Sequence, residues 1–86
     1  MSDENPNLKY YEEMIHGEDA IQFEGLDYAI IGVSLDGYYV YEYDTMVSIF
    51  MDEDDMTLEE AQEWVDYNVL SVNAGKGFVV IHSWEV

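Results

Sequence analysis

Two runs of β-branched and aromatic residues, 28–35 and 38–43, flank the dipeptide Asp36-Gly37. An Asp-Gly pair between such runs is the strongest short-range indication of a β-hairpin, because both residues tolerate the positive φ angles of a tight turn. A two-residue turn would pair Leu35 with Tyr38 and would fix which side chains share each face of the hairpin. The sequence therefore predicts an antiparallel hairpin as the central element of the chain.

The expected hairpin has one face of tyrosines and one aliphatic face. Tyr39, Tyr41 and Tyr43 alternate along the second strand and therefore lie on the same side of it. The opposite face is the expected seat of the helices and is aliphatic: Ala29, Ile31, Val33, Leu35 and Val40. In a chain this short, two helices cover only one face of a sheet, so the tyrosine face needs a cover of its own.

Two covers for the tyrosine face are open at this point. Tyrosine is enriched at protein interfaces, which makes Tyr39, Tyr41 and Tyr43 candidate partner-binding residues, either for another protein or for a second copy of this chain in a homodimer. Alternatively, the segment before the hairpin folds back over this face and contributes its own apolar side chains: Tyr10, Tyr11, Ile15 and Phe23.

Two helices are expected after the hairpin. Asp44 is placed to cap a first helix from Thr45 to about Asp52. Thr57 and Glu60 have the spacing of a capping box at the start of a second helix. The apolar stripe of that second helix is Leu58, Ala61, Val65, Val69 and Val72, with Trp64 beside it.

A third strand is predicted over residues 78–84, which gives the order β-β-α-α-β. This order indicates an α+β domain, with an antiparallel sheet and both helices on one face of it. Residues 1–9 are polar and are expected to form a flexible N-terminus, and residues 10–86 a single small domain.

Charge restricts the possible partners more than any motif does. Twenty Asp and Glu residues stand against two Lys and no Arg, a formal net charge of −18. Direct binding to nucleic acid or to an anionic membrane is not expected, because both require basic side chains. A hydrophobic fraction of 49% argues equally against a disordered acidic tail. With no long apolar run and no signal peptide, we expect a soluble intracellular protein.

The acidic residues are densest between positions 52 and 66. No basic residue lies between Tyr10 and Gly75, whereas an ordinary solvated helix interleaves lysine with glutamate. Solubility alone is one explanation of this segment, and an electrostatic role in binding is the other. The candidate partner-binding patch consists of Asp52, Glu53, Asp54, Asp55, Glu59, Glu60, Glu63 and Asp66.

Charge density decides whether the whole surface can imitate DNA. A chain of this mass exposes about 5,000 Å², or roughly 280 Å² per net charge, whereas B-DNA offers about 100 Å² per charge. An even distribution is therefore too dilute. Only carboxylates gathered on about 40% of the surface would match the charge density of DNA.

The sequence predicts neither an enzyme nor a metal or cofactor site. Asp52, Asp54 and Glu63 have three of the positions of a calcium-binding EF-hand loop, but Met56 and Thr57 replace the required ligand and glycine. His16 and His82 are the only imidazoles, and no phosphate-binding loop or catalytic triad pattern is present. We therefore expect no catalytic residue, no cofactor and no metal.

Several stretches of the chain resemble a widespread family of small acidic proteins of tailed bacteriophages. These are residues 27–32, which include the sequence AIIG, then Tyr41 with Asp44, and above all residues 55–69, which follow the pattern DMTxEEAxEWxDYNV. The resemblance covers residues 24–82. It departs at the last strand, where Lys76-Gly77-Phe78 replaces a Thr-Pro pair found in many members.

The resemblance implies a phage protein made in the cytoplasm of a bacterial host, and it carries over no catalytic residue. Small acidic phage proteins include inhibitors of restriction enzymes, CRISPR effectors and nucleoid proteins, which is an analogy of class. The leading hypothesis is a non-enzymatic inhibitor that occupies the basic nucleic-acid-binding surface of a host protein, as a DNA mimic. The alternative is an accessory protein that associates through the tyrosine face, with acidity serving only solubility.

Overall fold

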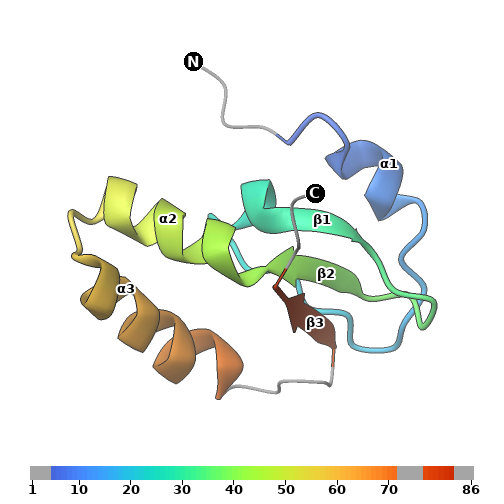
Figure 1. Cartoon of the computed structure of the whole chain (residues 1–86). Coiled ribbons are helices and arrows are strands. Elements are labelled where there is room, and N and C mark those ends of the chain that lie inside the picture. The colour runs from blue at the N-terminus through green and yellow to red at the C-terminus, as the bar shows by residue number, and fades with distance from the viewer. Residues whose placement is uncertain (1–4, 72–76, 83–86) are drawn as a thin grey trace.

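The computed structural model describes residues 5–71 and 77–82 and forms one α+β domain (Figure 1). The main elements follow the predicted order β-β-α-α-β, with a short helix before them. The elements are α1 (Leu8–Glu12), the 3₁₀ turn η1 (Asp27–Ala29), β1 (Ile30–Val33), β2 (Tyr39–Glu42), α2 (Tyr43–Glu53), α3 (Leu58–Val65), the π-helical turn η2 (Asp66–Leu70) and β3 (Phe78–Ile81).

The hairpin is present, but its turn is one residue longer than predicted. The backbone N–H of Ser34 donates to the carbonyl oxygen of Tyr38 at 2.8 Å, and that of Gly37 donates to Ser34 at 2.9 Å. Gly37 has a φ of 88°, the left-handed conformation that closes a three-residue hairpin loop. The side-chain oxygen of Ser34 also accepts from the N–H of Tyr38, which fixes the longer loop.

The longer loop shifts the strand register by one residue. Val33 pairs with Tyr39 and Gly32 pairs with Val40, instead of the predicted pairing of Leu35 with Tyr38. A bulge between Ile30 and Gly32 shifts the register by one further residue, so that Ile30 lies opposite Tyr41. The expected division of the side chains into two faces therefore does not hold, since Val33 of the expected aliphatic face lies opposite Tyr39.

The tyrosine face lies inside the molecule, and its prediction as a binding surface is wrong for Tyr39 and Tyr41. Tyr39 is 5% exposed and Tyr41 is fully buried. They share one core with residues of α2 and α3, including Met46 and Val65. The aliphatic face is the more open one, since Leu35 is fully exposed and Ile31 is 39% exposed.

The segment before the hairpin packs against the core, which confirms the alternative prediction for Tyr11, Ile15 and Phe23 but not for Tyr10, which is 65% exposed. The ring of Phe23 meets those of Tyr41 and Phe78 edge to face, with centroids 5.6 and 4.9 Å apart. The backbone N–H of Phe23 donates to the hydroxyl oxygen of Tyr41 at 2.8 Å. This bond satisfies the one polar atom of a buried side chain, so the tyrosine can be a core residue.

The third strand runs parallel to β2, which corrects the predicted antiparallel sheet. The strand order is β1-β2-β3, with Tyr39 opposite Phe78 and Glu42 opposite Ile81. α2 leaves directly from the end of β2, and α3 returns beside it in the opposite direction (Figure 1). A helical hairpin brings the chain back to the end of the sheet where β2 begins, so the next strand enters in the same direction.

Two element boundaries differ from the prediction. α2 begins at Tyr43 with Glu42 as its N-cap residue, so Asp44 lies in the first turn and is not the cap. The hydroxyl of Thr45 donates to the carboxylate of Glu42, which holds this strand-to-helix junction without a loop. β3 ends at Ile81, and the predicted strand residues 83 and 84, like Val72 of the helical stripe, lie outside the described residues.

Residues 5–9 belong to the domain, although they were expected to form part of a flexible N-terminus. α1 spans the expected boundary between residues 9 and 10. The side-chain amide of Asn5 donates to the carbonyl oxygens of Asp27 and Ile30, at 3.0 and 2.8 Å. The hydroxyl of Tyr11 donates to the carbonyl oxygen of Ile31 at 3.2 Å, so the N-terminal segment is attached to the β1 side of the sheet.

Replacing Tyr41 by phenylalanine tests the internal position of the tyrosine face. Tyr41→Phe keeps the ring but leaves the N–H of Phe23 without its acceptor, so we expect a loss of about 1–2 kcal/mol in the free energy of unfolding. Urea denaturation measures this loss. Tyr28→Phe is the matched control, since Tyr28 is 57% exposed, and it should change stability by less than about 0.5 kcal/mol. Equal stability of the two variants would contradict the arrangement.

Alkaline pH should destabilise the protein through the same residue. Burial raises the pKa of the Tyr41 hydroxyl to about 12 from its ordinary value of 10.0. The unfolded chain therefore loses this proton first, and stability falls between pH 10 and pH 12 by up to about 1.4 kcal/mol per pH unit from this one group. Denaturation midpoints measured across this range should fall less steeply in Tyr41→Phe than in the wild type. Parallel curves for the two proteins would contradict the assignment.

Candidate functional site

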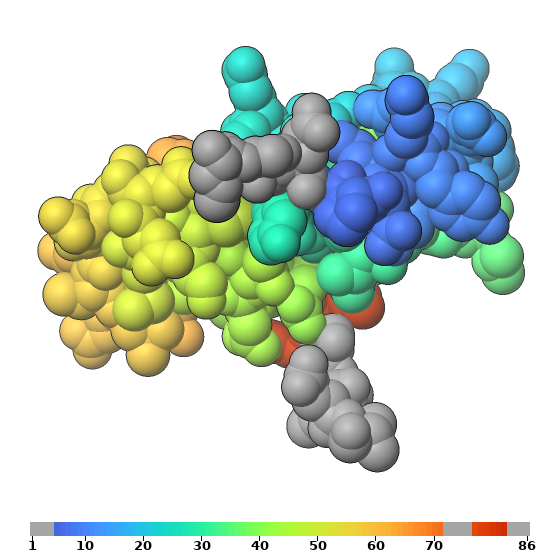
Figure 2. Space-filling view, turned by 90° about the horizontal axis from the view of Figure 1, so that it is seen from above, coloured from blue at the N-terminus to red at the C-terminus, as the bar shows by residue number. Residues whose placement is uncertain are grey.

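All eight residues of the predicted acidic patch are exposed. They follow one another around the helical hairpin: two at the end of α2, two in the connecting turn, three on α3 and one at the start of η2. This helical-end acidic surface consists of Asp52, Glu53, Asp54, Asp55, Glu59, Glu60, Glu63 and Asp66. Figure 2 shows that α2 and the beginning of α3 form one end of the molecule, while α1 and the segment after it lie toward the other.

The turn between the helices is built by residues of the patch itself. The N–H of Asp54 donates to the carbonyl oxygen of Phe50 at 3.0 Å, and Asp55 takes a left-handed conformation with a φ of 58°. The predicted capping box is confirmed, since the carboxylate of Glu60 accepts from the N–H of Thr57 and the Thr57 hydroxyl accepts from the N–H of Glu60. These contacts end α2 and begin α3, so they fix the position of the turn between the two helices.

Helix stability accounts for only part of this charge. Glu59 and Glu60 lie in the first turn of α3, where the helix dipole favours negative side chains. Asp52 and Glu53 lie in the last turn of α2, where the same dipole disfavours them, and that turn contains no basic residue. Charges that cost helix stability and face solvent need another explanation.

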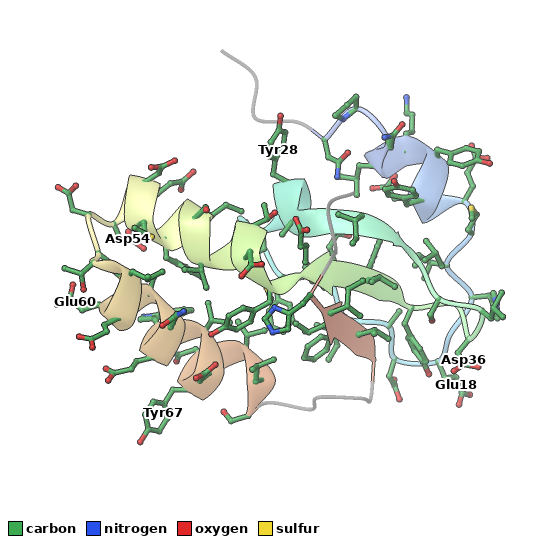
Figure 3. The ribbon with its side chains drawn as sticks, in the orientation of Figure 1. Glu18, Tyr28, Asp36, Asp54, Glu60 and Tyr67 are labelled. Atoms are coloured by element: carbon green, nitrogen blue, oxygen red, sulfur yellow. The ribbon has the colours of Figure 1, made fainter. Side chains whose placement is uncertain are left out.

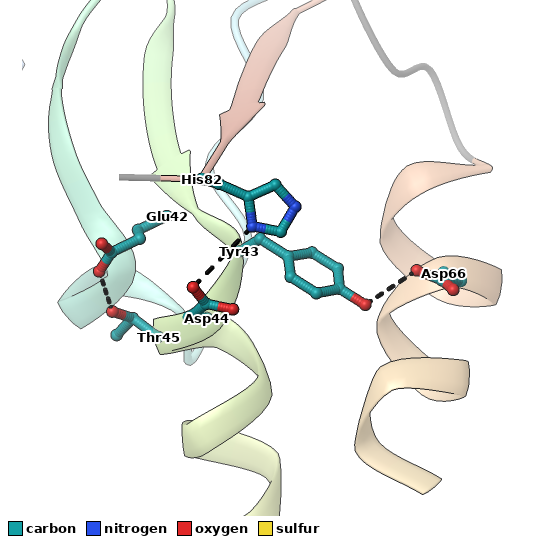
Figure 4. Close-up of polar contacts among 6 residues, drawn as sticks. All are labelled: Glu42, Tyr43, Asp44, Thr45, Asp66 and His82. Atoms are coloured by element: carbon teal, nitrogen blue, oxygen red, sulfur yellow. Dashed lines mark hydrogen bonds and ion pairs between the residues drawn. The ribbon is translucent and has the colours of Figure 1, made fainter. Parts of the chain in front are cut away.

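Counter-charges are scarce within the part of the chain that the structure describes. Its single lysine, Lys9, belongs to α1. The one ion pair found there joins Nδ1 of His82 to Asp44 at 3.9 Å, near the start of α2 and outside the helical-end acidic surface (Figure 4). Asp66 accepts a hydrogen bond from the half-buried Tyr43 at 3.2 Å, and burial, with the nearby charge of Asp66 second, raises the pKa of that hydroxyl.

The acidic side chains are not confined to the helical end. Glu18 and Asp36 are exposed at the opposite end of the molecule from Asp54 and Glu60 (Figure 3). The accessible surface is 6098 Å², about 340 Å² per unit of the net charge of −18, which is more dilute than the sequence estimate. Imitation of DNA by the whole surface is therefore excluded, and only a local patch can reach a high charge density.

Aromatic side chains lie within the helical-end acidic surface, which the sequence analysis missed. Trp64 of α3 is 39% exposed and Tyr67 of η2 is 78% exposed. They line an open, shallow groove of about 650 Å³ together with Met56, Glu60, Glu63 and Asn68. The helical period contained this signal, because Tyr67 follows Glu60 by seven residues and Glu63 by four and so belongs to the charged face.

The groove has a fixed frame. The indole ring of Trp64 packs against the ring of Phe50 from α2, with centroids 4.4 Å apart and planes inclined at 38°. The side-chain amide of Asn68 donates to the carbonyl oxygen of Trp64 at 3.0 Å, where the helix changes to the wider π-helical turn η2. The hydroxyl of Ser71 donates to the carbonyl oxygen of Tyr67. These bonds satisfy carbonyl groups at the helix end and fix the backbone from which the two aromatic side chains project.

The described residues contain no cluster of three or more carboxylates or imidazoles placed to hold a metal ion. Likewise, no helix within residues 5–71 is long and apolar enough to cross a membrane. Comparison of the chain with models of protein families, with curated proteins and with solved structures finds no match. The resemblance to small acidic phage proteins therefore stays a prediction.

Two charge reversals on α3 separate the capping role from surface charge. Glu63→Lys relieves repulsion with Glu59 and creates an i, i+4 pair, so we expect a gain of about 0.2–0.5 kcal/mol in the free energy of unfolding at low salt. Glu60→Lys changes the charge equally but removes the acceptor of the Thr57 N–H, and it should lose about 0.5–1 kcal/mol. Urea denaturation distinguishes them, and a loss of stability in Glu63→Lys would show that its carboxylate is needed for folding.

Proposed function

We propose that this chain is a non-enzymatic binding protein that occupies the basic nucleic-acid-binding surface of another protein. The observation that carries the proposal is the overlap of charge and apolar contact area on one face. The exposed carboxylates Glu60 and Glu63 line the same groove as the exposed rings of Trp64 and Tyr67. Electrostatic attraction speeds and orients an encounter, and a central aromatic anchor supplies the contact that loses water.

The choice of a basic partner follows from the sign and the placement of the charge. All eight side chains of the helical-end acidic surface are exposed, and the helices that carry them contain no lysine or arginine. Such a surface repels nucleic acids and anionic lipids. Adjacent carboxylates on a helix are about 5–6 Å apart, close to the spacing of phosphates along a nucleic-acid strand. A groove that binds phosphates can therefore accept this face in place of DNA or RNA.

We propose further that the target is a bacterial protein. The resemblance to small acidic proteins of tailed bacteriophages favours a bacterial host protein, such as a defence nuclease or a CRISPR effector, which this protein would inhibit in the host cytoplasm. The alternative of an accessory protein or a homodimer that associates through the tyrosine face does not fit the structure, because Tyr39 and Tyr41 are buried in the core.

Two variants of equal net charge test the proposal. The helical-end variant carries Asp54→Asn, Glu59→Gln and Glu63→Gln, and the far-end variant carries Glu18→Gln, Asp19→Asn and Asp36→Asn. None of these six side chains is needed for a capping contact, and each variant loses three exposed carboxylates. The tethered wild-type protein is incubated with bacterial lysate, and proteins released by duplex DNA are identified. Their dissociation constants are then measured between about 50 and 300 mM NaCl.

We expect the wild type to retain nucleic-acid-binding proteins that DNA displaces, with affinity falling at least tenfold over this salt range. The helical-end variant should bind the identified partner at least tenfold more weakly, while the far-end variant stays within about threefold of the wild type. An affinity that is flat with salt, or equal losses in the two variants, would rule out the proposal.

A further inference from the structure

The groove on α3 has the chemistry of a site for one cationic side chain. It is lined by the apolar residue Met56, the aromatic residues Trp64 and Tyr67 and the acidic residues Glu60 and Glu63, together with Asn68. An apolar occupant would remove water from two carboxylates without pairing them, which is costly. An anionic occupant would be repelled. A cation pairs with the carboxylates and is attracted to the electron-rich faces of the aromatic rings.

The groove is preorganised for such an occupant. Packing against Phe50 holds the indole ring of Trp64, and the bond from the N–H of Thr57 holds the carboxylate of Glu60 at 3.0 Å. Glu63 precedes Tyr67 by one helical turn, so their side chains are neighbours on the helix surface. Trp64 and Glu60 are therefore already in place before binding, which lowers its entropic cost.

Between the two basic side chains, the groove fits arginine better than lysine. The guanidinium group is flat, stacks on an aromatic ring and pairs with a carboxylate through two parallel N–H groups. It is also more weakly hydrated than an ammonium group, so it enters a partly apolar groove at lower cost. An open groove of about 650 Å³ leaves room for the flanking backbone of the partner as well as the side chain.

We propose that the groove formed by Met56, Glu60, Glu63, Trp64, Tyr67 and Asn68 binds an arginine side chain of the partner protein. The guanidinium contacts the exposed parts of both Trp64 and Tyr67 and pairs with Glu63. This proposal rests on the proposed function and deepens it, because it names the partner residue that provides the central contact.

The probes are two short peptides of equal charge, one with four arginines and one with four lysines, separated by glycines and blocked at both ends. Binding is followed at 150 mM NaCl by the NMR signal of the Trp64 indole N–H, which is assigned with Trp64→Phe. We expect the arginine peptide to bind about 3–10-fold more tightly than the lysine peptide and to shift this signal. Equal affinities, or an indole signal that does not move, would overturn the proposal.

Tyr67→Leu provides the variant test without endangering the fold, because Tyr67 is 78% exposed. Leucine keeps apolar area but removes the ring, so the preference for arginine should fall below about twofold while lysine-peptide affinity stays within twofold. Tyr10→Leu, at a tyrosine of α1 that is 65% exposed, is the matched control and should retain the full preference. A preference that survives both Tyr67→Leu and Trp64→Leu would also overturn the proposal.

The two proposals fail in different ways. If the arginine and lysine peptides bind equally while the captured partner still shows salt-dependent binding at the helical end, the proposed function stands and the arginine site is wrong. If arginine is preferred at Trp64 but the partner binds independently of salt and of the helical-end substitutions, the groove is an arginine site and the proposed function is wrong.

Discussion

The hydrogen bond from the Phe23 N–H to the Tyr41 hydroxyl, within the cluster of Phe23, Tyr41 and Phe78, is the contact on which the rest of the fold depends. The three rings of this cluster come from segments that are distant in sequence: the stretch before the hairpin, the central strand β2 and the edge strand β3. By satisfying a buried phenol, it allows the tyrosine face to be the inner face of the sheet. The helices then complete the same core with Met46 and Val65, and their charged sides remain in solvent.

This arrangement decides which aromatic side chains are exposed to a partner. The aromatic residues that looked available in the sequence, Tyr39 and Tyr41, are used by the core. The aromatic residues that remain available are Trp64 and Tyr67, and they lie among the carboxylates of α3. The electrostatic patch and the apolar anchor are therefore one surface. The acidic residues in the last turn of α2 are disfavoured by the helix dipole, so helix stability does not explain them.

The sequence predicted the elements well where the signal was local. The capping box of Thr57 and Glu60, the hairpin at Gly37 and the exposure of the acidic patch all depend on neighbouring residues. The strand register was missed because the side chain of Ser34 stabilises a three-residue loop. The helices were expected on the aliphatic face, but their core residues cluster with Tyr39 and Tyr41. The parallel direction of β3 depends on α2 and α3 together, because this pair of helices returns the chain to the end of the sheet where β2 begins. The groove of Trp64 and Tyr67 could have been predicted from the helical period, because Trp64 was expected beside the apolar stripe and Tyr67 follows Glu63 by one turn.

Amide hydrogen exchange of the protein, alone and in complex with a partner that DNA displaces, tests the central claim most directly. The account predicts slower exchange in the complex within residues 54–70, together with the indole N–H of Trp64, and unchanged exchange at the hairpin loop around Asp36. Protection confined to the hairpin loop, to α1 or to the open aliphatic face of the sheet would contradict it, because the partner would then bind away from the helical-end acidic surface.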